Sequence, residues 1–94
     1  MAEEKILTKH PQGKTGRSIS RQSYDTLKTS ILAALGKKEL THTELFEYLN
    51  KNLKGKFDGN ISWYGETVKL DLEARKIIAR DNSKPPRYRA LKKN

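Results

Sequence analysis

The sequence predicts an α+β fold, in which a core of three helices is preceded by a short N-terminal strand or arm and followed by a C-terminal β-hairpin. Three observations lead to this prediction. Apolar residues recur at helical spacing in three segments, capping residues precede them, and two short apolar runs flank a proline-containing turn near the end of the chain. The 94 residues fit one domain. We expect an arm with a short strand and loop at residues 1–19, the main domain at residues 20–91 and a basic tail at residues 92–94.

The first predicted helix spans residues 20–35. Ser20 is a favourable N-cap, apolar residues follow at helical spacing, and Gly36 is placed to end the helix. Before this helix, residues 5–9 are expected to form a short strand, and residues 10–17, which are rich in turn formers, a loop.

Two further helices follow a short extended link at residues 37–40. Thr41 and Glu44 have the spacing of a capping box, in which each side chain accepts a hydrogen bond from the other residue's free backbone N–H. A second helix is therefore expected to begin there. The third helix is predicted at residues 62–76, with two apolar flanks and a polar face between them.

Residues 77–80 and 87–91 predict two strands, joined by a turn at residues 81–86 that contains tandem prolines. This order of elements resembles the winged helix-turn-helix superfamily. The local similarity runs from Thr67 to Arg80, and it resembles the end of the recognition helix and the first wing strand of many bacterial regulators. The resemblance implies a winged helix, whose third helix enters the DNA major groove and whose hairpin is the wing.

Three other stretches, HPQGKTGRSI, FDGNISWYGETVKLDLEAR and PPRYRAL, resemble a small family of uncharacterised bacterial proteins. That family carries no assigned activity, so the resemblance supports the fold and says little about function. Lys76 stands where winged-helix families often place a glycine. We therefore expect the end of the third helix to be built differently here.

Positive charge is concentrated near the C-terminus. The chain has a net charge of +9, and residues 77–94 contain six basic residues against Asp81 alone. Strand alternation places Arg87 and Arg89 on one face of the hairpin, with Tyr88 and Ala90 on the other. The cations expected to contact phosphates from this wing are Arg80, Lys84, Arg87, Arg89 and Lys92. The alternative is that these charges only protect an edge strand from aggregation.

The polar face of the third helix offers a second set of contacts. Ser62 and Lys69 are the residues expected to reach base edges. Glu66 and Glu73 share that face, and their carboxylates repel phosphates. Strong insertion into a groove is therefore not the favoured mode of binding.

Lys14, Arg17 and Arg21 are expected to touch phosphates as a basic arm. The tripeptide at residues 13–15 lacks the earlier glycine of a phosphate-binding loop, and no helix follows it at the right offset. We therefore do not interpret it as a nucleotide site.

Trp63 and Leu70 lie on the second apolar flank of the third helix. They are candidates for a homodimer seam or for the binding site of a protein partner. The favoured alternative is that Ile6 and Leu7, in the N-terminal strand, cover them within the same chain.

The residues offer no support for an enzyme, a metal or a cofactor. There is no cysteine, and His10 and His42 have no ligand spacing around them and are interpreted as surface residues. No nucleophile has an evident base. Asp71 and Arg75, four residues apart, are interpreted as a structural ion pair.

The longest apolar stretch, at residues 31–35, is far too short to span a bilayer, and the first residues do not resemble a signal peptide. We therefore expect a cytoplasmic protein that makes no membrane contact. Its expected partner is DNA, bound through the cations of the wing and the arm. RNA remains open, because a basic hairpin does not distinguish the two polymers. The alternative is a protein-interaction module on the same scaffold.

Overall fold

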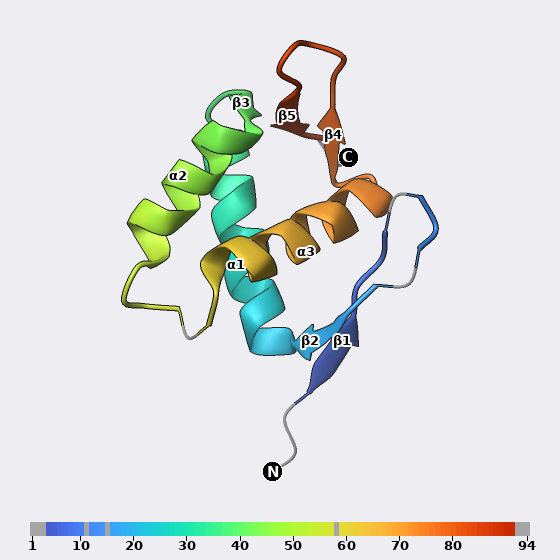
Figure 1. The fold of residues 1–94 in the computed structure, drawn as a ribbon, viewed down its shortest axis with the longest axis vertical. Coiled ribbons are helices and arrows are strands. Elements are labelled where there is room, and N and C mark those ends of the chain that lie inside the picture. Colours follow the sequence, from blue (N-terminus) through green and yellow to red (C-terminus); the bar gives the residue numbers. More distant parts are fainter. Residues whose placement is uncertain (1–3, 11, 15, 58, 92–94) are drawn as a thin grey trace.

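The computed structural model describes residues 4–10, 12–14, 16–57 and 59–91 (Figure 1). Within them the chain is α+β, and its order of elements matches the arrangement of a winged helix, as predicted. The helices are α1 (Arg21–Leu35), α2 (His42–Leu53) and α3 (Ile61–Ala74). The strands are β1 (Lys5–Leu7), β2 (Ser18–Ser20), β3 (Leu40–Thr41), β4 (Ile78–Arg80) and β5 (Arg87–Ala90).

The predicted caps start the first two helices. The side chain of Ser20 accepts a hydrogen bond from the backbone N–H of Ser23, at 3.1 Å. Both bonds of the Thr41 and Glu44 capping box are present, at 2.9 and 3.2 Å. The predicted start of α3 at residue 62 is wrong by one residue, because the side chain of Asn60 accepts from the N–H of Trp63 and makes Ile61 the first helical residue.

The end of α3 is closed by Lys76 in the left-handed conformation, with φ of 61°. Its N–H donates to the carbonyl of Glu73, and the N–H of Ile77 donates to the carbonyl of Leu72. These two bonds form a Schellman motif, in which glycine normally occupies the left-handed position. The helix therefore ends at Ala74, before the predicted residue 76, and Lys76 takes the conformation that a glycine would adopt at lower cost.

Two small antiparallel sheets complete the described part of the chain. β1 pairs with β2, a pairing that the sequence did not predict, because residues 18–20 were assigned only to the approach to the first helix. β5 is the central strand of the other sheet, between β3 and β4. Tyr88 of β5 lies opposite Leu40 of β3 and Arg80 of β4, so the link between α1 and α2 fastens the hairpin to the core.

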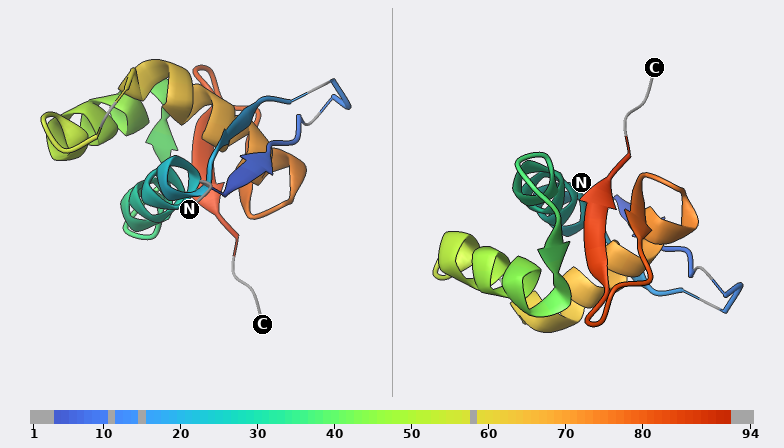
Figure 2. Two further views of the ribbon diagram at one scale, coloured as in Figure 1. Left: turned by 90° about the horizontal axis from the view of Figure 1, so that it is seen from below. Right: turned by 90° about the horizontal axis from the view of Figure 1, so that it is seen from above.

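The core lies between the helices and the inner face of the larger sheet. In Figure 1 α1 passes behind α3, and both views of Figure 2 show the two helices in separate layers. Gly65 lets α3 approach α2 closely, because a Cβ there would lie 2.9 Å from the ring of Phe46. The fully buried apolar residues are Leu27, Ile31, Leu45, Leu49, Val68, Leu72 and Ile78. β2 contributes Ile19, which is also buried, so the N-terminal segment packs on the same core.

Candidate nucleic-acid interface

The hairpin presents its predicted phosphate-binding cations to solvent. The four that the structure describes are exposed, and in the described part of the chain no carboxylate oxygen lies within 4.0 Å of them. These residues are Arg80, Lys84, Arg87 and Arg89. They are therefore free of the internal ion pairs that would oppose binding to an external anion. Lys92, the fifth predicted contact, lies outside the described residues.

The strand register divides these cations between two faces of the hairpin. Arg80 lies opposite Tyr88, and directly opposed residues of antiparallel strands share a face. The buried ring of Tyr88 shows that this face turns toward α3 and the core. Arg87 and Arg89 alternate with Tyr88 and belong to the outer face, as predicted. The four cations therefore do not form one patch. The sequence alone could not show this, because it does not give the register between β4 and β5.

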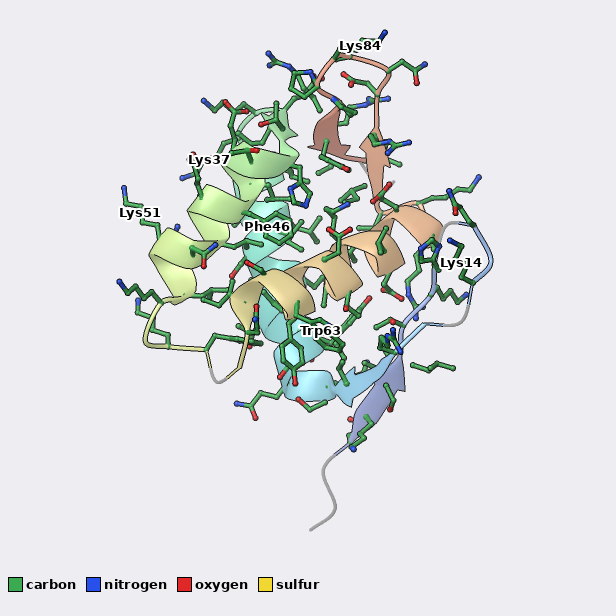
Figure 3. All side chains as sticks on the ribbon, viewed as in Figure 1. Lys14, Lys37, Phe46, Lys51, Trp63 and Lys84 are labelled. Carbon is green, nitrogen blue, oxygen red and sulfur yellow. The ribbon has the colours of Figure 1, made fainter. Side chains whose placement is uncertain are left out.

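The turn of the hairpin is held by Asp81. Its carboxylate accepts hydrogen bonds from the backbone N–H groups of Ser83, at 3.0 Å, and Arg87, at 2.9 Å. These bonds lower the pKa of Asp81. Its carboxylate is therefore ionised at neutral pH and can accept both hydrogen bonds of the turn. Lys84 lies at the tip and projects away from the body of the protein (Figure 3).

The prediction that Lys69 faces the bases is wrong, because only 2% of the residue is exposed. The hairpin folds over it, and its ammonium lies 4.4 Å from the centre of the Tyr88 ring and 3.2 Å from the hydroxyl oxygen. Glu73 lies at 3.0 Å and Glu66 at 3.7 Å. Burial alone would lower the pKa of Lys69, but the charges of Glu73 and Glu66 outweigh it and raise the pKa. Lys69 is a buried cation that joins α3 to the hairpin.

The first turns of α3 remain accessible. Ser62 is exposed, as a base-facing residue would need to be. Glu66 is held by His42, whose Nε2 lies 3.1 Å from its carboxylate, and the His42 ring stacks on Phe46 at 4.2 Å. His42 is exposed, as predicted for a surface residue, but it also links α2 to α3.

The loop between β1 and β2 brings Lys14 and Arg17 to the side of α3. Both are exposed, and they border a hollow of about 250 Å³ that Thr67 and Leu70 also line. The loop is closed by Thr8, whose hydroxyl accepts from the N–H of Arg17 at 2.8 Å. Figure 3 shows Lys14 on this loop, and α3 lies between it and the hairpin that carries Lys84.

The expectation that β1 covers the apolar flank of α3 is wrong. Trp63 is 45% exposed, and Leu7 of β1 is itself 64% exposed. Ile6 alone of the two strand residues packs on the core. Leu70 is half-buried, and residues of the following loop lie beside it. Trp63 stands on the front of α3 in Figure 3, packed edge-on against Tyr64.

Arg21, the third member of the predicted arm, lies apart from Lys14 and Arg17. It is the first residue of α1, and its guanidinium approaches Glu4 at 3.8 Å and Asp25 at 3.9 Å. It lines a different hollow, together with basic residues that the sequence did not identify as contacts for an anion. Those residues come from separate parts of the chain, so no local motif could have found them.

The described parts of the chain give no indication of a metal centre or of a membrane span. They contain no group of three or more side chains able to hold a metal ion. None of their helices has the length and apolar composition needed to cross a membrane. The exposed face of α3, with the hairpin on one side and the basic loop on the other, is the best candidate for an interface.

A family model matches residues 5–88, so the chain belongs to a family of unknown function, DUF6958. The match begins at the first residue of β1 and ends within β5, so it includes all three helices and most of the hairpin. No curated protein and no solved structure matches the chain. The family therefore defines a relationship without assigning an activity.

Proposed function

We propose that this protein is a cytoplasmic DNA-binding domain of the kind found in transcriptional regulators, which holds the phosphate backbone through its hairpin and its β1–β2 loop. The observation that carries the proposal is the set of exposed, carboxylate-free cations on two sides of α3. Arg80 and Lys84 lie on the hairpin, and Lys14 and Arg17 lie on the loop. Spaced cations of this kind suit a polyanion better than a single small anion.

Phosphate contacts rather than base contacts would dominate this binding. The exposed part of α3 offers Ser62 and Thr67 but no accessible Lys, Arg or Gln, and Glu66 opposes nearby phosphates. Arg, Lys, Asn and Gln make most specific contacts to base edges. We therefore expect weak sequence preference and strong dependence on salt.

The first test is a titration of fluorescently labelled duplex DNA, followed by anisotropy at several salt concentrations. With four phosphate contacts, the logarithm of the binding constant should fall with the logarithm of salt concentration with a slope of about −3 to −4. Binding that does not respond to salt, or no binding at low salt, contradicts the proposal. A parallel titration with duplex RNA of the same sequence separates the two polymers, and tighter RNA binding would reassign the partner.

Paired charge reversals then locate the surface. Arg80→Glu with Lys84→Glu alters the inner face and the tip of the hairpin, and Arg87→Glu with Arg89→Glu alters the outer face. The control is Lys51→Glu with Lys54→Glu at the far end of α2, which changes the net charge equally. We expect the first pair to weaken binding at least about tenfold more than the control. Equal losses in all three double variants would mean that only net charge matters, and would reject the assigned surface.

A protein-interaction module is the second candidate, and the exposure of Trp63 favours it. An indole that is 45% exposed on a helix is a typical anchor at protein interfaces. Self-association through this flank predicts that the sedimentation coefficient rises with concentration, and that Trp63→Ser abolishes the rise. A monomer at all concentrations would exclude the homodimer and leave only a different protein as partner.

A further inference from the structure

A second group of basic residues surrounds an open hollow of about 600 Å³, formed by β1, the first turns of α1 and the end of α3. The view from below in Figure 2 shows these segments near one another. The basic residues that line the hollow are Lys9, Arg21, Lys28, Arg75 and Lys76. The other lining residues are Ile6, Tyr24, Ala74 and Ile77, so no acidic residue lines it. None of the hairpin cations belongs to this group.

One buried carboxylate, that of Asp71, holds several of the residues that line the hollow. Asp71 is fully buried and accepts a hydrogen bond from the hydroxyl of Tyr24. It also accepts from the backbone N–H of Lys9, at 2.7 Å, and from Nε of Arg75, at 2.9 Å to each oxygen. Three lining residues from three segments are thus fixed by one group. The walls of the hollow are therefore preformed, and a ligand would have to order only the lysine side chains around them.

The positive charge at this hollow is only partly compensated. Asp71 neutralises Arg75, and the exposed Glu4 and Asp25 approach Arg21 alone, at 3.8 and 3.9 Å. In the described residues no carboxylate lies within 4.0 Å of the ammonium groups of Lys9, Lys28 and Lys76. Like charges around one hollow repel each other, and a bound anion would relieve that repulsion.

The backbone at Lys76 is an independent observation on the same hollow. This lysine holds a φ of 61°, in the left-handed region that favours glycine. The Schellman motif at the end of α3 requires this conformation, and a lysine in place of the cheaper glycine keeps a cation at the hollow. Here it places an ammonium group at the rim of a hollow that is already basic.

We propose that this hollow binds a small ligand that carries two or more linked phosphate groups, such as a nucleoside di- or triphosphate. Its size lies within the range of small-molecule sites, about 300–1,000 Å³. A single phosphate, with a charge of about −1.5 to −2 at pH 7, would not fully neutralise the three uncompensated ammonium groups. Ile6, Ala74 and Ile77 supply apolar surface for the part of the ligand that carries no phosphate. The proposal is independent of the DNA contact, because the two surfaces share no residue. Arg21, predicted as part of the basic arm, lines the hollow instead.

The test is isothermal titration calorimetry with inorganic tripolyphosphate, and with sodium sulfate at equal ionic strength as the reference anion. We expect saturable binding of one tripolyphosphate, at least about tenfold tighter than sulfate, because several linked charges act at once. Chemical-shift changes of backbone amides should be largest at Lys9, Arg75 and Lys76. Unsaturable binding, or shifts spread over all basic surfaces, would overturn the proposal.

The double variant Lys28→Gln with Lys76→Gly tests the site itself. Lys76→Gly suits the left-handed backbone, so the variant should remain folded while two cations are lost. We expect its affinity for tripolyphosphate to fall about tenfold or more, since contacts of charged groups are the stronger ones. The control, Lys51→Gln with Lys84→Gln, removes the same charge elsewhere and should retain binding. Equal losses in the two variants would overturn the proposal.

Duplex DNA distinguishes this proposal from the one above. The hairpin variant Arg80→Glu with Lys84→Glu should lose duplex binding and keep tripolyphosphate binding. The Lys28 and Lys76 variant should do the reverse. If the latter loses duplex binding and the wild-type protein ignores tripolyphosphate, the hollow is a contact for nucleic-acid phosphates and the small-ligand proposal fails.

Discussion

Lys69 and Asp71 stand two residues apart on α3, carry opposite charges and are both buried, yet they fasten the helix to different parts of the molecule. Side chains two residues apart on a helix point about 200° apart around its axis. Lys69 therefore meets Tyr88 of the hairpin, and Asp71 meets Tyr24 of α1 and the backbone of Lys9. The two sides of α3 are held by two separate ionic centres.

The two centres differ in how completely they exclude water. Asp71 is 0% exposed, and its partners are two neutral donors and one guanidinium. Lys69 has two carboxylate partners, and the side chain of one of them, Glu66, is 46% exposed. The side chain of Arg75 is 31% exposed, but Tyr24 is buried, so among the side-chain partners of Asp71 water can replace only the guanidinium. We therefore expect the loss of Asp71 to cost more stability than the loss of Lys69.

The largest expected effect is that of Asp71→Ala. Removing this carboxylate leaves the buried Tyr24 hydroxyl and the N–H of Lys9 without an acceptor, so we expect a loss of about 3–5 kcal/mol in the free energy of unfolding. Urea unfolding followed by circular dichroism measures it. Asp25→Ala is the control, because this carboxylate is exposed and should contribute little. If Asp71→Ala lowers the free energy of unfolding by less than about 1 kcal/mol, Asp71 contributes no more than an exposed carboxylate and the expected difference between the two centres is wrong.

Lys69→Ala should lower the free energy of unfolding by less, about 2–3 kcal/mol, because Glu73, left without its cation, keeps some access to water. Lys69→Met should recover part of this loss, since its side chain fills the same space beneath Tyr88. Urea unfolding of both variants measures the difference. If Lys69→Ala is the more damaging of the two buried-charge variants, the proposed ranking of the two centres is wrong.

Local chemistry predicted the helices well, and the reason is visible at Ser20 and Thr41. Their caps satisfy backbone groups within three residues, so the determining contacts are contained in the local sequence. The alternation of Arg87 and Tyr88 was predicted for the same reason, because it depends only on the two-residue period of a strand.

The candidate sites were less predictable, because they depend on contacts between distant segments. Lys69 has the spacing of an exposed polar residue on a helical wheel, and only the folding of the hairpin over α3 buries it. The ion pair of Asp71 and Arg75 was predicted from its spacing, but its burial depends on Tyr24, which is 47 residues away. The basic hollow is formed by residues from opposite ends of the chain.

The two tyrosines bond to different centres, Tyr24 to Asp71 and Tyr88 to Lys69. Tyr24→Phe should cost about 1–2 kcal/mol, because it removes a buried donor from Asp71. Tyr88→Phe should cost less than about 1 kcal/mol, since Lys69 keeps two carboxylate partners and the aromatic ring. Urea unfolding at neutral pH measures both differences. Equal costs would mean that the two centres are equally shielded from water.

The pH dependence of Tyr24 gives a second measurement on the same hydroxyl. Burial, followed by the hydrogen bond to Asp71, raises the pKa of Tyr24 above its ordinary value of 10.0. A group whose pKa is raised on folding contributes stability below its unfolded pKa and loses it as the pH rises through the folded value. The stability difference between the wild-type protein and Tyr24→Phe should therefore shrink above about pH 10. A constant difference across that range would contradict this assignment.

Replacement of Lys76 should change the free energy of unfolding least. This residue follows the end of α3 and holds a strained, left-handed backbone. Lys76→Gly should raise the free energy of unfolding by about 0.5–1 kcal/mol, because relief of the left-handed strain exceeds the entropic cost of glycine. The same replacement at Lys51, in right-handed helix, should lower it by about 0.5–1 kcal/mol. Lys76→Gln removes the charge but keeps the strained backbone, so it separates conformation from repulsion among the neighbouring cations. If Lys76→Gln stabilises the protein as much as Lys76→Gly, charge repulsion rather than φ limits stability at this end of α3.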